Sequence, residues 1–371
     1  VSHDESQEIE KANFSALTLM LAQECNMRCS YCYGEGGEYN NKGIMTENVA
    51  FQAIDYLVKN STDELLHIAF LGGEPLLNFP LLKKVVEYCK QISADTGKKF
   101  SYTITTNGTL ITDNIEKYLT ENKIVCQISL DGTKEKNDMN RFFRNKKGSY
   151  DVIVEKTKSM RHMNLVTARA TVTPDNSDYK EIFNHLNELE FRAIPIAIAQ
   201  NMVDDEQFDK ILSEYINYIF YFEELILTKQ YAKAKKMTDL VNALEKIEFG
   251  NVRNNGCGAG RTMFAVDIDG TLYPCHRFVG ERKFALGNIW TGSDNSKFLK
   301  MINVRNRDKC SKCWAQNLCL GCCPHENYTN TNNINLASER SCRMAKTIYE
   351  KLISVYIKMS DEDKKMMWPE D

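Results

Sequence analysis

Short apolar runs alternate with amphipathic stretches along the first 200 residues of the chain. The apolar runs predict six β-strands, at 14–22, 67–71, 100–105, 124–130, 167–172 and 193–199. Apolar residues at helical spacing predict helices between them, at 45–59, 79–93, 112–121, 149–163 and 178–189, with Thr46 as the first N-cap. Regular alternation of this kind predicts an α/β fold with a parallel sheet and helical crossovers. Six units are too few for a closed eight-stranded barrel.

The rest of the chain follows a different pattern. Helical spacing over 206–228 and 229–246, with many aromatic residues, predicts a helical connection whose aromatics pack in a helix core. Residues 267–275 predict a short hairpin with Asp269-Gly270 as its turn. We therefore expect five segments: a linker or tag remnant at 1–13, an α/β domain at 14–200, the helical connection at 201–250, a cysteine-rich domain at 251–343, and a helix and tail at 344–371.

The composition narrows the class of protein. Of the 371 residues, 43% are hydrophobic and 26% charged, which supplies a sizeable core. A formal net charge of −3 argues against binding nucleic acid through bulk positive charge. The sequence contains no secretory signal and no apolar run long enough to cross a bilayer, so we expect a cytoplasmic protein without membrane contact.

The chain has thirteen cysteines, and three of them lie close together. A disulfide framework is typical of small secreted proteins, so metal binding explains this number better. Cys25, Cys29 and Cys32 directly follow the first predicted strand, where α/β folds place their chemistry. Three thiolates can hold three irons of a [4Fe–4S] cluster and leave the fourth open. The alternative is a zinc site, which usually takes four ligands.

The spacing CxxxCxxC, with Tyr31 before its last cysteine and Tyr33 after it, resembles the signature of the radical S-adenosylmethionine (SAM) enzymes. The resemblance implies a partial (β/α)6 TIM-like barrel. It also implies that the open iron is chelated by SAM, and that one electron cleaves SAM to a 5′-deoxyadenosyl radical, which takes a hydrogen atom from the substrate.

The same resemblance implies a set of SAM contacts. Gly72-Gly73-Glu74-Pro75 matches the family's GGEP motif, whose main-chain carbonyls contact the SAM amino group. Arg141 matches an arginine that pairs with the SAM carboxylate, a natural partner for a guanidinium. Other matching positions flank the ribose, carboxylate or adenine: Ser129, Tyr31 and Ile194. The alternatives are a plain turn, a surface arginine, a serine bonded to nearby backbone and ordinary core side chains.

A second cysteine pattern occupies the last third of the chain. It reads C-x12-G-x4-C, then C-x2-C-x5-C-x3-C, then C, and resembles the SPASM domain at all seven cysteine positions. The resemblance implies two auxiliary [4Fe–4S] clusters, hence three clusters in all. The outer one would be held by Cys310, Cys313, Cys319 and Cys342, and the inner one by Cys257, Cys275 and Cys323. Paired zinc sites are the alternative.

Three further cysteines fall outside that pattern. Cys322 stands where relatives have Gly, and as a spare ligand it would close the open position of the inner cluster. Cys89 and Cys126 lie in a predicted helix and strand, and we expect them to be buried small hydrophobes.

His276 follows Cys275, where the related anaerobic sulfatase maturases carry a catalytic aspartate. The surrounding Tyr-Pro-Cys-His-Arg-Phe-Val-Gly stretch instead resembles maturases that build thioethers in ribosomally made peptides. His276 could serve as a base, as a donor to a cluster sulfur, or as a packed residue beside the cluster.

We therefore expect a radical SAM maturase that joins a cysteine sulfur to carbon in a precursor peptide. Alternatives are formylglycine formation, and, outside enzymes, an electron carrier or a zinc scaffold. Expected partners are a Cys-containing precursor peptide and a flavodoxin- or ferredoxin-type electron donor. Residues 1–13 are too short for a leader-peptide-binding domain, so we expect this domain to be missing or supplied in trans.

Overall fold

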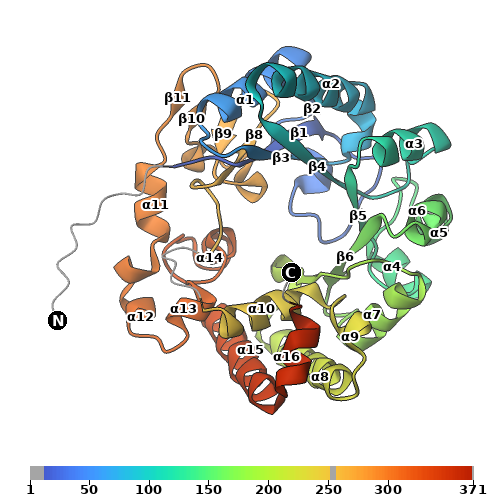
Figure 1. The fold of residues 1–371 in the computed structure, drawn as a ribbon, viewed down its shortest axis with the longest axis vertical. Coiled ribbons are helices and arrows are strands. Elements are labelled where there is room, and N and C mark those ends of the chain that lie inside the picture. Colours follow the sequence, from blue (N-terminus) through green and yellow to red (C-terminus); the bar gives the residue numbers. More distant parts are fainter. Residues whose placement is uncertain (1–11, 251–255, 370–371) are drawn as a thin grey trace.

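A computed structural model describes residues 12–250 and 256–369, and it contains the predicted parallel sheet. Six parallel strands run in the order β1-β3-β4-β5-β6-β7. Their bounds are β1 (Ala16–Gln23), β3 (Leu65–Gly72), β4 (Lys99–Thr106), β5 (Val125–Ser129), β6 (Val166–Val172) and β7 (Ile196–Ile198). Helices cover the outside of these curved strands (Figure 1), as in the expected partial barrel. The predicted linker at 1–13 lies almost wholly outside the described residues.

Strand β3 has an apolar outer face and a more polar inner face. In β3, Leu66, Ile68 and Phe70 are fully buried beneath the helices, since side chains alternate across a strand. The alternate residue His67 is half-buried on the inner face, where its ring nitrogens contact the hydroxyls of Ser101 at 3.0 Å and Thr103 at 2.9 Å. The polar face therefore lines the inside of the barrel.

The barrel helices agree with the predictions except that α4 was not predicted and one predicted helix is broken. They are α1 (Glu47–Lys59), α2 (Phe79–Thr96), α3 (Asp113–Glu121), α4 (Lys134–Asn140), α5 (Tyr150–Lys156), α6 (Lys158–His162) and α7 (Tyr179–Glu188). Thr46 caps α1 as predicted, accepting from the Val49 amide at 3.4 Å. The helix predicted at 149–163 is two helices that meet at Thr157. The strand predicted at 193–199 is shorter, because Pro195 lacks the amide for strand pairing.

The helical connection packs most of its aromatics inside, as expected, although Phe220 is exposed. It consists of α8 (Asp205–Leu227), α9 (Tyr231–Ala234) and α10 (Thr238–Glu248), so the helix predicted at 229–246 is interrupted. Tyr215 and Tyr218 of α8 lie against Tyr179 of α7, with ring centroids 4.9 and 5.6 Å apart. The long helix α15 (Glu339–Lys358) packs on α8 and is followed by α16 (Asp361–Met367) (Figure 1).

The cysteine-rich region is joined to the barrel through its sheet. The predicted hairpin forms between β8 (Met263–Val266) and β9 (Thr271–Tyr273), with Gly270 at φ 82° in its turn. Strand β8 pairs in parallel with β1, so the hairpin extends the barrel sheet past its first strand. The remaining short elements are β2 (Gly43–Ile44), β10 (Gly287–Asn288), β11 (Gly292–Ser293), α11 (Ser296–Ile302), α12 (Asp308–Ser311), α13 (Gln316–Cys319) and α14 (Pro324–Thr331). Within the described part of the chain, every helix is too short or too polar to cross a membrane.

Candidate active site

The loop with the first three cysteines begins directly after β1 and is held by backbone hydrogen bonds. The Arg28 amide donates to the Phe142 carbonyl at 2.8 Å, and the Ser30 amide to the Asn140 carbonyl at 2.9 Å. Burial raises the pKa of the Cys25 thiol to about 11, and the neighbouring Glu74 and Cys29 add to this. The Cys25 thiol therefore needs a nearby positive charge, such as iron, to become a thiolate.

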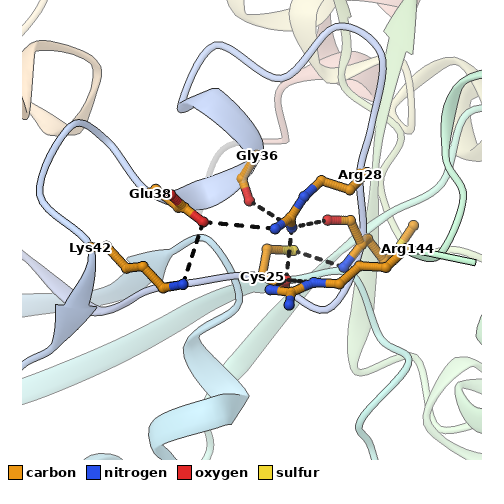
Figure 2. Close-up of polar contacts among 7 residues, drawn as sticks. Cys25, Arg28, Gly36, Glu38, Lys42 and Arg144 are labelled. Atoms are coloured by element: carbon orange, nitrogen blue, oxygen red, sulfur yellow. Dashed lines mark hydrogen bonds and ion pairs between the residues drawn. The ribbon is translucent and has the colours of Figure 1, made fainter.

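Two arginines converge on the carbonyl oxygen of Cys25 (Figure 2). Arg144 donates to it from Nε at 3.2 Å and from Nη2 at 2.7 Å, and Arg28 donates from Nη1 at 3.0 Å. Arg28 also binds the carbonyls of Met27 and Gly36, at 2.7 and 3.2 Å. The two guanidinium groups fix the loop and bring positive charge to its first cysteine. The sequence analysis did not identify either contact, although Arg28 lies inside the cysteine motif.

The two motif glycines allow the end of β3 to approach the end of β1. The Gly73 amide donates to the Ala22 carbonyl, and the Glu74 amide to the Glu24 carbonyl, both at 2.8 Å. A Cβ on Gly72, whose φ is 142°, would lie 2.2 Å from the Ala22 oxygen, and a Cβ on Gly73 would lie 2.3 Å from the Glu24 oxygen. Close backbone packing therefore requires glycine at both positions, and it places the motif beside the cysteine loop.

The buried side chain of Glu74 is fully used by the protein. Its carboxylate accepts hydrogen bonds from the Leu76 amide at 3.0 Å, the Thr106 hydroxyl at 2.7 Å and the Asn107 amide at 2.8 Å. Burial raises its pKa, and these donors counteract that rise. Glu74 thus ties β3 to β4, so any contact with a ligand would come from its main chain.

Arg141 is buried, so the surface-arginine alternative is wrong. Its Nη1 donates to the Tyr31 hydroxyl at 2.8 Å, which in turn donates to Asp131 at 2.5 Å. Its Nε is buried without a hydrogen-bond partner. Burial and the charge of Arg141 act in opposite directions on the pKa of the Cys29 thiol, so the guanidinium lies close to that cysteine. A buried, unpaired N–H donor beside a cysteine loop fits the carboxylate of SAM.

The other two predicted SAM contacts lie at different depths. Ser129 is the last residue of β5, half-buried, and its hydroxyl has no hydrogen-bond partner among the described residues. The alternative of a backbone-bonded serine is therefore not observed. Ile194 is only 1% exposed and belongs to the hydrophobic core.

The inner cysteine set comes together around η4 (His276–Phe278), the 3-10 turn after β9. Burial raises the pKa of the Cys275 thiol to about 12, and the neighbouring Cys323 and Cys257 raise it further. Arg277 places Nη1 4.0 Å from the Cys323 sulfur and 2.9 Å from Glu326. The same guanidinium lies 5.5 Å from the Tyr33 ring, next to Cys32. Arg277 therefore connects the inner set to the first loop.

His276 is held neutral by its surroundings. Burial, together with the positive charges of Arg277 and Arg169, lowers the pKa of its imidazole to about 4. Arg169 lies on β6 opposite Ser129, and the sequence analysis did not identify it. Its position on the strand face that lines the barrel was visible only once the register was known.

The outer set lines a cavity of about 420 Å³, and it includes Cys322. The cavity is lined by five cysteines: Cys310, Cys313, Cys319, Cys322 and Cys342. The Cys322 sulfur lies 3.5 Å from that of Cys319, whereas Cys323 faces the inner set. A hydrogen bond from the Cys322 thiol lowers the pKa of Cys319 to about 6. Cys322 therefore turns away from the inner set.

The described residues hold no ready-made site for a single metal ion. A zinc site would bring four donors to about 2.3 Å from one centre. No group of three or more His, Cys, Asp and Glu side chains among the described residues is close enough to hold one metal ion. Cys89 and Cys126 are fully buried, as expected.

Comparison with known proteins identifies the family. The model of the radical SAM superfamily matches residues 20–189, and that of the SPASM iron–sulfur cluster-binding domain matches residues 257–314. The chain belongs to the radical SAM superfamily. It is an enzyme with a SPASM domain. Taken together, the radical SAM and SPASM domains imply [4Fe–4S] clusters and bound SAM.

Several characterised proteins resemble this radical SAM enzyme over most of its length. A cysteine-type anaerobic sulfatase-maturating enzyme of Clostridium novyi is 26% identical over 92% of this chain and 96% of its own. The structure of native anSMEcpe with bound AdoMet and Cp18Cys peptide has a TM-score of 0.75 at 22% identity, covering 93% of this chain and 99% of that one. Streptococcus suis SuiB bound to precursor peptide SuiA has a TM-score of 0.57 at 16% identity, covering 90% and 76%.

Proposed function

We propose that this enzyme installs thioether crosslinks, cysteine sulfur to carbon, in a ribosomally made precursor peptide. The observation that carries the proposal is the inner set, where Cys257, Cys275 and Cys323 stand together and Cys322 points elsewhere. Three thiolates leave one iron of a [4Fe–4S] cluster without a protein ligand. A cysteine thiolate of the substrate peptide is the ligand that suits this position.

The first site supplies the radical chemistry in this proposal. Cys25, Cys29 and Cys32 would hold the cluster, and the unpaired Nε of Arg141 would bind the SAM carboxylate. SAM bound at a reduced cluster provides a strong oxidant that removes one hydrogen atom from a substrate. Arg28 and Arg144 hold the loop in position, and Glu74 holds the neighbouring strand ends.

The chain then has to orient the peptide between the first loop and the inner set. Arg277 lies near both Cys323 and the Tyr33 ring, and its pairing with Glu326 fixes its guanidinium. His276, also in this region, stays neutral beside Arg277 and Arg169, so it would act as a hydrogen-bonding group. The barrel face with His67 and Arg169 provides polar contacts for a peptide backbone.

Two kinds of structural neighbour support a peptide substrate. One was solved with the Cp18Cys peptide and the other with precursor peptide SuiA. The account further proposes three clusters, with Cys310, Cys313, Cys319 and Cys342 around the outer one. It also proposes reduction by a flavodoxin- or ferredoxin-type protein.

Formylglycine formation is the second candidate, and the full-length similarity to a cysteine-type sulfatase maturase favours it. Against it, His276 occupies the position that matches the catalytic aspartate of the sulfatase maturases. An electron carrier is set aside because the chain belongs to a superfamily of enzymes.

The proposal is tested by reconstituting the protein anaerobically with iron and sulfide, then adding SAM and dithionite. We expect about twelve irons per chain, as three four-iron clusters require, and release of 5′-deoxyadenosine. Cys-containing peptides encoded beside the gene should then alter the electron paramagnetic resonance spectrum of the inner cluster. The same peptides with Cys→Ser should leave it unchanged. Equal spectra with both peptides would contradict an inner cluster open to substrate thiolate.

A further inference from the structure

The outer cysteine set contains one thiol more than its proposed cluster requires. A [4Fe–4S] cluster takes one ligand per iron, so four cysteines are sufficient. Five line the cavity: Cys310, Cys313, Cys319, Cys322 and Cys342. Cys322 is the additional one, because it has no counterpart in the SPASM spacing.

The backbone folds Cys322 back onto Cys319. Helix α13 ends at Cys319, and the next three residues all have left-handed backbone angles, with φ of 55° at Leu320, 80° at Gly321 and 62° at Cys322. Side chains other than glycine rarely adopt this conformation. The amides of Gly321 and Cys322 both donate to the Cys319 sulfur, and the Cys322 thiol lies 3.5 Å from it. This tight turn therefore presents two sulfurs at one corner of the cavity.

The two sulfurs lie 3.5 Å apart, close enough for either one to reach the same metal position. Cys322 also lies 3.7 Å from the Ser341 carbonyl, next to Cys342, so its sulfur is inside the ring of outer ligands. It would need little movement to reach the iron that Cys319 reaches.

We propose that Cys319 and Cys322 are exchangeable ligands of the same iron in the outer cluster. The inference rests on the proposed function, which places a cluster there. Either thiol, as its thiolate, would hold that iron while the other stays protonated, so no oxidant or reductant is needed. The outer cluster would then survive the loss of either thiol.

Cysteine variants of the reconstituted protein test this directly through iron content and Mössbauer spectra. Cys319→Ala and Cys322→Ala should each retain the wild-type iron content. The double variant keeps three outer cysteines, the number that holds each of the other two proposed clusters, so its Mössbauer spectrum should show one iron without a thiolate ligand. Cys313→Ala and Cys342→Ala are the matched controls, since each of these positions has no second thiol at its corner. Both controls should show the same altered iron, whereas neither Cys319→Ala nor Cys322→Ala should.

The outcomes separate the inference from the proposal beneath it. The altered iron in Cys319→Ala, with a wild-type spectrum in Cys322→Ala, would overturn the inference and leave Cys322 as a hydrogen-bond donor to its neighbour. Wild-type spectra in both control variants would instead remove the outer cluster, and with it that part of the proposed function.

A second measurement does not depend on the variants folding. Holoprotein treated with iodoacetamide and digested should carry the label on Cys319 in some molecules and on Cys322 in others. No molecule should carry the label on both thiols. Label on Cys322 alone would show that no exchange occurs.

Discussion

The guanidinium of Arg144 donates two hydrogen bonds to the carbonyl oxygen of Cys25, from Nε at 3.2 Å and from Nη2 at 2.7 Å. The contact spans 119 residues of sequence and ties the loop after α4 to the first cysteine of the cluster motif (Figure 2). Arg28 donates to the same oxygen from within the motif. One carbonyl thus receives two positively charged donors, which is a stronger constraint than neutral hydrogen bonds would provide.

Replacing Arg144 should therefore loosen the first cysteine loop without causing loss of its cluster. We expect Arg144→Ala to slow SAM cleavage about tenfold, the effect of losing about 1.4 kcal/mol of positioning. Arg144→Lys should recover part of the rate, because one donor remains. Lys146→Ala, two residues away and exposed, is the control. The reduced cluster's resonance spectrum should broaden in Arg144→Ala only, and an unchanged spectrum and rate would contradict this role.

Arg141 should act on SAM affinity. Its buried Nε is unpaired, and its Nη1 is already used by Tyr31. Removing one partner of a buried charged contact typically costs about 2–5 kcal/mol, so Arg141→Lys should raise the SAM dissociation constant at least tenfold. The measurement is equilibrium dialysis with labelled SAM on protein of matched iron content. Tyr31→Phe is the comparison, since it removes the bridging hydroxyl and keeps the guanidinium. Unaltered affinity in Arg141→Lys would rule out the contact.

The motif glycines should be essential for folding. A Cβ at Gly73 would meet the Glu24 carbonyl at 2.3 Å, and at Gly72 it would meet the Ala22 carbonyl at 2.2 Å. Backbone cannot move away as a side chain can, so each change to Ala should destabilise the fold by about 3 kcal/mol or more. Gly97→Ala is the control, because Gly97 also has a positive φ, 74°, but has no atom within 4 Å of the added Cβ. It should cost only about 1 kcal/mol. Thermal unfolding midpoints measure the difference.

His67 should make stability depend on pH. Burial in the barrel wall lowers its pKa, so the folded state keeps the imidazole neutral. The unfolded state takes up a proton below about pH 6.5, and stability therefore falls as pH drops through that value and levels off below the folded pKa. His67→Gln retains hydrogen bonding to Ser101 and Thr103 without the titration. Its denaturant midpoint should change less than that of the wild type between pH 7.5 and pH 5.5. An equal change of the midpoint in both proteins would show that His67 is not the titrating group.

The sequence predicted the barrel well because its signals are local. Each strand and helix carries its own apolar periodicity, and Thr46 marks a helix start by residue type alone. The pairing of β8 with β1 has no such signal, since Ala16 and Met263 meet only after the whole barrel has formed. The break at Thr157 within a predicted helix was equally hidden, because helical spacing continues through it.

The sequence predicted which residues belong to the candidate site, but not which way their side chains point or how deeply they are buried. Cysteine spacing predicted which thiols would group together, whereas the orientation of Cys322 depends on three successive left-handed residues that spacing does not reveal. The burial of Arg141 was also hidden, because Arg144, Lys146 and Lys147, a few residues further on, are basic and exposed. Its depth follows from the packing of α4 beneath the first loop, which is a tertiary property.

The most direct test of the central claim is the mass of a Cys-containing precursor peptide after reaction. Short peptides encoded beside the gene would be incubated with reconstituted enzyme, SAM and reductant, then alkylated and sequenced by mass spectrometry. The account predicts loss of two hydrogens per crosslink, with sulfur retained and the cysteine no longer open to alkylation. Loss of the sulfur and appearance of an aldehyde, in these peptides or in Cp18Cys, would contradict it and establish formylglycine formation instead.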